Sequence, residues 1–170
     1  MKTNKTQLIG ATSIVVILVG LSLVAQQGST TSAPTLKGVW RNTQITFTGP
    51  NARTVAAQPG LYIFTDRHFS IVRVNNDTAR PALPPPDKAT DKEVAAALRA
   101  FTAFAGRYEV VGDELRATST VELFPNNMRP GGFPRVFTYR IDGKTLQLVQ
   151  KTINNTPVAN PLTLRYERVE

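Results

Sequence analysis

The sequence contains no cysteine, which excludes disulfides, thiolate metal sites, a cysteine nucleophile and a lipid-modified cysteine. The folded state must therefore be held together by its hydrophobic core. Histidine occurs once, at His68, so there is no set of imidazoles for a zinc site. We favour a polar turn residue at His68 over a general base. The residue types present lead us to expect no metal and no cofactor.

Long runs of one charge are also missing. The chain has 20 basic and 12 acidic residues and a net charge of +8, but the two signs are interspersed. Such mixing favours a role in solubility over a basic tail that binds a polyanion. We therefore expect no nucleic-acid partner.

The first 35 residues have the composition of a targeting segment. Lys2 and Lys5 precede an uncharged stretch, residues 8–25, that is rich in Ile, Val and Leu, and small polar residues follow it. This order is typical of a secretory signal peptide. It predicts a signal peptide at 1–25, a flexible spacer at 26–35 and a domain at 36–170 that is periplasmic or secreted. The alternative is an uncleaved membrane anchor at 8–25, because about 17–25 apolar residues span a bilayer. We expect membrane contact only through this segment, and only where it stays uncleaved.

Alternating apolar and polar residues predict strands in the first half of the domain. Residues 39–47 alternate with period two, and residues 61–65 and 68–74 are separated by a two-residue turn at 66–67. Pairing across that turn places Phe64 opposite Phe69 and Tyr62 opposite Ile71. The face predicted to point inward carries five side chains: Tyr62, Phe64, Phe69, Ile71 and Arg73.

A helix interrupts the strands. The Pro-rich segment 81–87 reads as an extended connection, and Thr90 with Glu93 then forms a capping box. The box predicts a helix at about 90–104. Its apolar face is expected to carry Val94, Leu98, Phe101 and Phe104.

The last third predicts five more strands, at 107–111, 115–124, 135–141, 146–153 and 162–169, which are separated by turn residues such as Asp142-Gly143. The count is then about eight strands and one short helix, without the alternation of strand and helix that a parallel sheet requires. The sequence thus predicts an all-β protein with an antiparallel sheet. Closure into a barrel would remove the edges of that sheet.

Short sequence pieces support a family resemblance. Leu36-Lys37-Gly38-Val39-Trp40, the segment 60–66, the segment 106–110 and Asp142-Gly143-Lys144-Thr145-Leu146 follow one another in an order that resembles the bacterial lipocalin-like domain family, over about residues 36–170. The resemblance implies an up-and-down β-barrel that encloses a cavity. Gly38-Val39-Trp40 also looks like the Gly-x-Trp element of lipocalins, in which the Trp closes the barrel base and an Arg of the final strand packs on it. Arg165 or Arg168 would take that role here, in a cation-π contact worth about 0.5–2 kcal/mol.

Three functions remain open from the sequence. The first is binding of a small apolar or amphipathic molecule inside the barrel, and the candidate cavity wall is Tyr62, Phe64, Phe69, Ile71, Arg73, Tyr108, Glu122 and Tyr139. The second is an isomerase or cyclase in which Glu109, Glu122 or Tyr108 moves a proton. The third is a structural or partner-binding protein of the cell envelope with a basic surface. For each charged residue on a predicted strand, the simpler interpretation is that its side chain points outward, on the face of the sheet that meets solvent.

Overall fold

A computed structural model describes residues 35–75 and 77–170. The predicted signal peptide or anchor, and the spacer up to residue 34, lie outside the described residues. Eight strands make up the barrel: β1 (Gly38–Phe47), β3 (Gly60–Phe64), β4 (His68–Val74), β5 (Phe101–Val111), β6 (Glu114–Glu122), β7 (Phe133–Asp142), β8 (Thr145–Ile153) and β10 (Thr163–Arg168).

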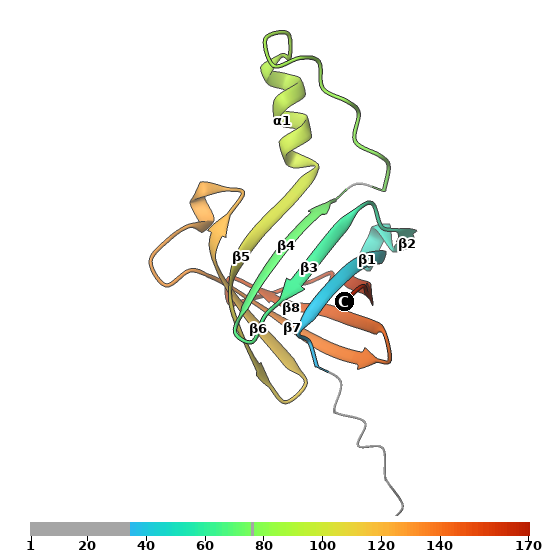
Figure 1. Cartoon of the computed structure of the whole chain (residues 1–170), viewed down its shortest axis with the longest axis vertical. Helices are drawn as coiled ribbons and strands as arrows, with labels where there is room; N and C mark the ends of the chain where they lie inside the picture. The colour runs from blue at the N-terminus through green and yellow to red at the C-terminus, as the bar shows by residue number, and fades with distance from the viewer. Residues whose placement is uncertain (1–34, 76) are drawn as a thin grey trace, which may run out of the picture. The chain divides into compact units, whose positions relative to one another are not determined.

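The strand order is that of an up-and-down barrel. Each barrel strand pairs antiparallel with the next one along the chain, and β10 pairs with both β8 and β1, which closes the sheet (Figure 1). The predicted fold class is therefore confirmed. Because the ring is closed, neither β1 nor β10 presents a row of unpaired backbone groups along the barrel.

Short elements sit beside the ring of strands. They are β2 (Arg53–Ala56), which pairs with β1, β9 (Thr156–Pro157), which pairs with β8, and the 3-10 turns η1 (Gly49–Asn51) and η2 (Pro125–Asn127). The turn between β8 and β9 uses Asn154 and Asn155 with φ of 50° and 63°. Asparagine tolerates this left-handed region, and two such residues in a row make the tight turn that matches strand twist.

Alternate side chains of the strands fill the interior. Phe64 lies opposite Phe69 and Tyr62 opposite Ile71, as the short turn at 66–67 predicts, and all four are buried. The rings of Tyr62 and Phe64 stack with centroids 4.5 Å apart. The pairing register predicted for this hairpin is confirmed.

Helix α1 (Asp91–Arg99) is shorter than the predicted span of 90–104. The capping box is present, since the Thr90 hydroxyl accepts from the amide of Glu93 and the Glu93 carboxylate accepts from the amide of Thr90. The helix ends because β5 begins at Phe101 and pairs with β4 from there. Phe101 and Phe104 therefore belong to a strand, and the expected four-residue helical face is not formed.

The helix stands beyond one end of the barrel (Figure 1), and none of its residues is buried. We call this end the mouth; the loop 123–132 also lies there, where β6 ends and β7 begins. The opposite end, which we call the base, holds the turns 65–67, 112–113 and 143–144.

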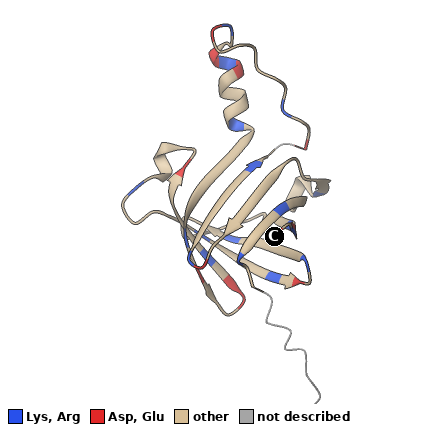
Figure 2. Cartoon of the chain, in the orientation of Figure 1, with Lys and Arg blue, Asp and Glu red and all other residues tan. Residues whose placement is uncertain are grey.

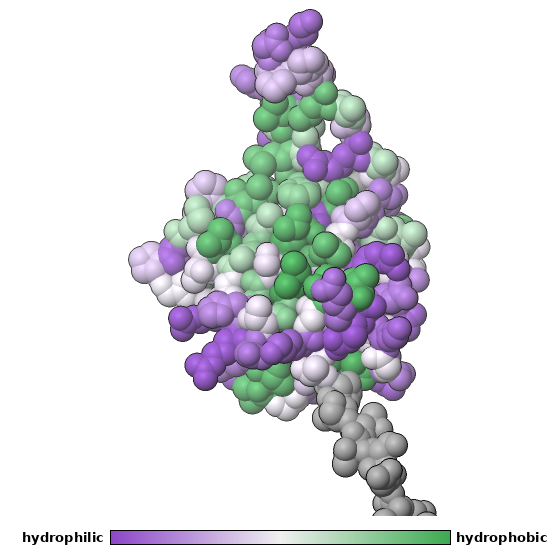
Figure 3. All heavy atoms as spheres, viewed as in Figure 1, coloured by the Kyte–Doolittle hydropathy of each residue, from purple (hydrophilic) through white to green (hydrophobic). Residues whose placement is uncertain are grey.

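The outer face of the neighbouring strands β3 and β4 is apolar. Leu61, Ile63 and Val72 are each 42–45% exposed, and Leu61 pairs directly with Val72. Few charges lie on the strands of this face in Figure 2, and Figure 3 shows hydrophobic side chains gathered over it. These exposed apolar side chains are not part of the core. The polar groups that could select a ligand do not lie on this face.

Candidate functional site

A cavity of about 300 Å³ opens at the mouth of the barrel. We call it the mouth cavity. Apolar side chains form much of its wall, and four titratable side chains join them: Tyr62, Arg73, Glu122 and Arg135. An apolar wall with a few convergent polar groups is the usual composition of a small-molecule site, and this volume is at the lower end of the range for such sites.

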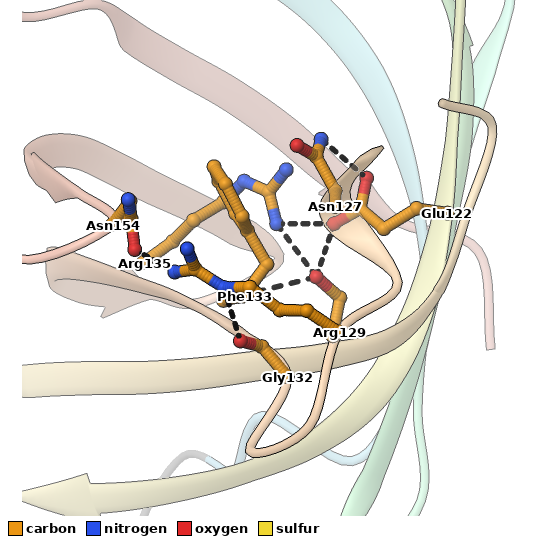
Figure 4. A network of polar contacts seen from close by, with 8 residues as sticks. Glu122, Asn127, Arg129, Gly132, Phe133, Arg135 and Asn154 are labelled. Carbon is orange, nitrogen blue, oxygen red and sulfur yellow. Dashed lines mark hydrogen bonds and ion pairs between the residues drawn. The ribbon is translucent and has the colours of Figure 1, made fainter. Parts of the chain in front are cut away.

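An ion pair crosses the wall of the mouth cavity from β6 to β7. Arg135 Nη1 lies 2.7 Å from Glu122 Oε1, and the two side chains are only 11% and 3% exposed (Figure 4). The same Nη1 donates to the Ser119 hydroxyl at 2.7 Å, and that hydroxyl donates to the Glu122 carboxylate. Asn127 Nδ2 reaches Glu122 Oε2 at 3.4 Å. Both charges therefore have partners, as buried charges require.

Aromatic rings hold the Arg135 guanidinium. Its central carbon is 4.1 Å from the centroid of Phe104 and 4.6 Å from that of Phe133. Arg129 lies 5.3 Å from the same Phe133 ring and donates to the carbonyl of Gly132, at the end of the loop 123–132 (Figure 4). The loop is thus tied to the ion pair through Phe133, and Arg135 has little freedom to leave Glu122.

Two buried phenols lie deeper in the interior. Tyr62 and Tyr166 are each about 1% exposed, and their ring centroids are 5.7 Å apart. Burial raises the pKa of Tyr62 well above its usual range, and burial raises the pKa of Tyr166 to about 12. Both hydroxyls therefore stay protonated at neutral pH and keep a proton to donate.

These pKa shifts predict a loss of stability in alkali. A tyrosine whose pKa is higher in the folded state stabilises the fold below its unfolded pKa of about 10, and this contribution is lost as the pH rises toward the folded value. At about pH 11 the expected loss is roughly 1 kcal/mol per tyrosine. Urea unfolding near pH 8 and pH 11 should show a smaller loss for the Tyr62→Phe/Tyr166→Phe double variant than for the wild type; an equal loss in both proteins contradicts the prediction.

The base of the barrel is formed around Trp40. This side chain is fully buried, and its indole N–H donates to the carbonyl of Leu36 at 2.7 Å. The Arg168 guanidinium lies 4.1 Å from the Trp40 ring centroid and donates to the carbonyls of Lys37, at 2.6 Å, and Thr35. Arg165, the other candidate for this contact, is exposed.

The structure brings some of the candidate wall residues together at the mouth cavity and leaves others apart. Tyr62, Ile71, Arg73 and Glu122 line the cavity, whereas Phe64 and Phe69 are packed in the core. Tyr108 donates its hydroxyl to the carbonyl of Thr65, in the turn at the base, and Tyr139 packs against the core.

The remaining candidates for proton transfer lie outside the mouth cavity. Glu109 is exposed and lies 3.9 Å from the Arg116 guanidinium. His68 is exposed at the start of β4, where its amide donates to the hydroxyl of Thr65. Of the three groups proposed to move a proton, Glu122 alone lines the mouth cavity.

Other lining residues were not in the candidate cavity wall named from the sequence: Phe104, Asn127, Arg135, Phe137, Gln150 and Leu164. The alternation along residues 135–141 places Arg135 and Phe137 on the face of Tyr139, so period two was the available signal for those two. Phe104 was hidden by its helical spacing from Val94 and Leu98. Asn127 lies in a loop, where no periodicity applies.

The described residues contain no helix that is long and apolar enough to cross a membrane. Within residues 35–75 and 77–170, no group of three or more His, Asp or Glu side chains is placed to hold a metal ion.

Comparison with known proteins gives structural matches alone. No family model matches the sequence, and no curated protein matches it. The structure is similar to a lipocalin-like protein from Bacteroides uniformis, with 15% identity, a TM-score of 0.43 and coverage of 78% of this chain and 97% of that one. It is also similar to an uncharacterized protein from Bacteroides eggerthii, with 13% identity, a TM-score of 0.42 and coverage of 77% and 98%.

The fold is an antiparallel up-and-down β-barrel. One fold hosts many unrelated functions, so the function of this barrel depends on the mouth cavity and its side chains.

Proposed function

We propose that this chain is a carrier that binds a small amphipathic molecule in the mouth cavity. The observation that carries the proposal is the cavity itself: about 300 Å³ of space whose wall is largely apolar and includes a few fixed polar groups. An eight-stranded barrel has room either for a packed core or for one small ligand. Here the core fills the base and the cavity occupies the mouth.

The ion pair between Glu122 and Arg135 supports the proposal. Its partners and the flanking aromatic rings hold it in one position, so the polar part of the wall is formed before a ligand arrives. A preformed wall lowers the ordering cost of binding. The export predicted from residues 1–25 would make such a carrier periplasmic or secreted, and this part of the proposal rests on the sequence.

Filling the mouth cavity tests the proposal. Gln150 lines the cavity from β8, so Gln150→Trp should weaken binding of the neutral fluorescent probe N-phenyl-1-naphthylamine at least tenfold, which is about 1.4 kcal/mol. Gln147→Trp places the same ring three residues earlier on β8, at a position outside the cavity lining, and is the matched control. A wild-type protein that does not bind the probe, or equal binding by both variants, contradicts the proposal.

A buried carboxylate in the mouth cavity also favours a second function, an isomerase or cyclase in which Glu122 moves a proton. Glu122 Oε1 is engaged by Arg135 and Ser119, whereas among the described residues Oε2 has only the 3.4 Å contact with Asn127. Oε2 is therefore the atom that would accept a proton. Native mass spectrometry of gently purified protein gives the mass of the bound molecule, and chromatography of that molecule before and after incubation separates the two functions: a carrier releases it chemically unchanged, and an enzyme converts it, also where the product is an isomer of the same mass.

A further inference from the structure

The charges that line the mouth cavity do not balance. Glu122 contributes one negative charge, and Arg135 and Arg73 each contribute a positive one. Arg135 is paired with Glu122 at 2.7 Å, but no ion pair joins Arg73 to an acidic side chain within the described residues. The cavity wall therefore carries one excess positive charge, and it belongs to Arg73.

Arg73 lines the mouth cavity together with Tyr62, one of the two buried phenols. It lies on the inward face of β4 with Phe69 and Ile71, and its charge lowers the pKa of both Tyr62 and Tyr166 against the larger effect of their burial. Its Nε is buried and, within the described residues, has no hydrogen-bond partner; the same holds for the Tyr62 hydroxyl. Buried polar groups are normally hydrogen-bonded, and both donors belong to residues that line one cavity. Each donor atom exposes less than 1 Å² in this structure, so an acceptor in the cavity reaches them after a shift of the two side chains.

The charge of Arg135 is already paired with Glu122. Its guanidinium donates to Ser119 and Glu122 and lies against the rings of Phe104 and Phe133. A ligand that used Arg135 would have to compete with a buried carboxylate at 2.7 Å. Arg73 and Tyr62 have no such competitor among the described residues, and they share the cavity with the apolar side chains of Ile71, Phe137 and Leu164.

We infer that the mouth cavity is selective for a small amphipathic carboxylate, whose anionic group is held by Arg73 and the Tyr62 hydroxyl and whose apolar part lies against Ile71, Phe137 and Leu164. The inference rests on the proposed carrier function and names its ligand class. A guanidinium and a phenol that both donate suit a carboxylate, and hydrogen bonds to a charged acceptor are stronger than those to a neutral one. Because Glu122 is already neutralised by Arg135, it does not repel the anion as a free carboxylate would.

Decanoate and decanol provide the test, because they share one alkyl chain and differ in the charge of the head group. Each is titrated against wild-type protein loaded with N-phenyl-1-naphthylamine. Decanoate should displace the probe at a concentration at least tenfold lower than decanol, as expected for a hydrogen bond to a charged group. Arg73→Met should abolish this tenfold preference and leave decanol unchanged, and Arg73→Lys, which keeps the charge, should restore part of it.

The matched control is Arg140→Met, which removes an exposed arginine from β7 and should keep the preference for decanoate. If the preference survives Arg73→Met, or is absent in the wild type while decanol still displaces the probe, the inference is overturned and the carrier function stands. If the wild type does not bind the probe, or if Gln150→Trp and Gln147→Trp bind it equally, the proposed function itself fails.

Discussion

Replacing Arg135 by methionine is expected to lower the free energy of unfolding by about 3–5 kcal/mol, the usual cost of leaving one member of a buried ion pair without its partner. The Glu122 carboxylate is 3% exposed, and without Arg135 it keeps only Ser119 and Asn127 as donors. Small domains have about 5–15 kcal/mol of stability in total. Urea unfolding at neutral pH should therefore show a strong shift of the midpoint to lower urea concentration.

Two comparisons separate the ion pair from a general effect of removing arginine. Arg116→Met breaks an ion pair of 3.0 Å with Glu114 on the surface, and its cost should be under about 1 kcal/mol because solvent already screens that pair. The double variant Glu122→Leu/Arg135→Met removes both buried charges and should be more stable than Arg135→Met alone. If Arg135→Met costs no more than Arg116→Met, the buried pair is not a major source of stability.

The hairpin of β3 and β4 could be predicted from the sequence because the signals that specify it lie in neighbouring residues. The two runs are separated by two residues, so the turn fixes the register, and period two then selects Tyr62, Phe64, Phe69 and Ile71 for the interior. The same argument succeeded for the number of strands, since turn residues separate each run from the next. Chain order alone then gives an up-and-down barrel.

The end of the helix could not be predicted, because two periods fit the same residues. Phe101 and Phe104 follow Val94 and Leu98 at helical spacing, and phenylalanine also favours strands. Pairing with β4 decides between the two: seven residues of β5 lie opposite β4, from Phe101 to Arg107. That contact is between segments that are far apart in the sequence, so no local pattern reports it.

The ion pair of the mouth cavity was equally inaccessible to the sequence. Glu122 was a candidate for the cavity wall and Arg135 begins the predicted strand 135–141, but their contact depends on the loop 123–132 and on where β6 ends. The structure adds this information by closing the barrel. The same closure leaves Arg73 without an acidic partner among the described residues, which the count of charges along the chain could not show.

Replacing Trp40 by alanine is expected to lower the free energy of unfolding by about 3–5 kcal/mol, the usual range for deleting a buried Trp or Phe side chain. Trp40 is fully buried and pairs in register with Tyr62 on β3 and Arg168 on β10. The deletion would leave a void at the base, remove the surface on which Arg168 lies and break the indole hydrogen bond to Leu36. Chemical unfolding at neutral pH measures the effect.

Two further variants separate the contributions to the stability cost of Trp40→Ala. Trp40→Phe keeps an aromatic ring under Arg168 but loses the indole donor, so it should cost less than Trp40→Ala. Phe124→Ala, at the mouth, deletes a ring that is 45% exposed and should cost under about 1 kcal/mol. Because Trp40 lies at the base, Trp40→Phe should leave binding of N-phenyl-1-naphthylamine at the mouth unchanged; weakened binding by this variant would show that the two ends of the barrel are coupled.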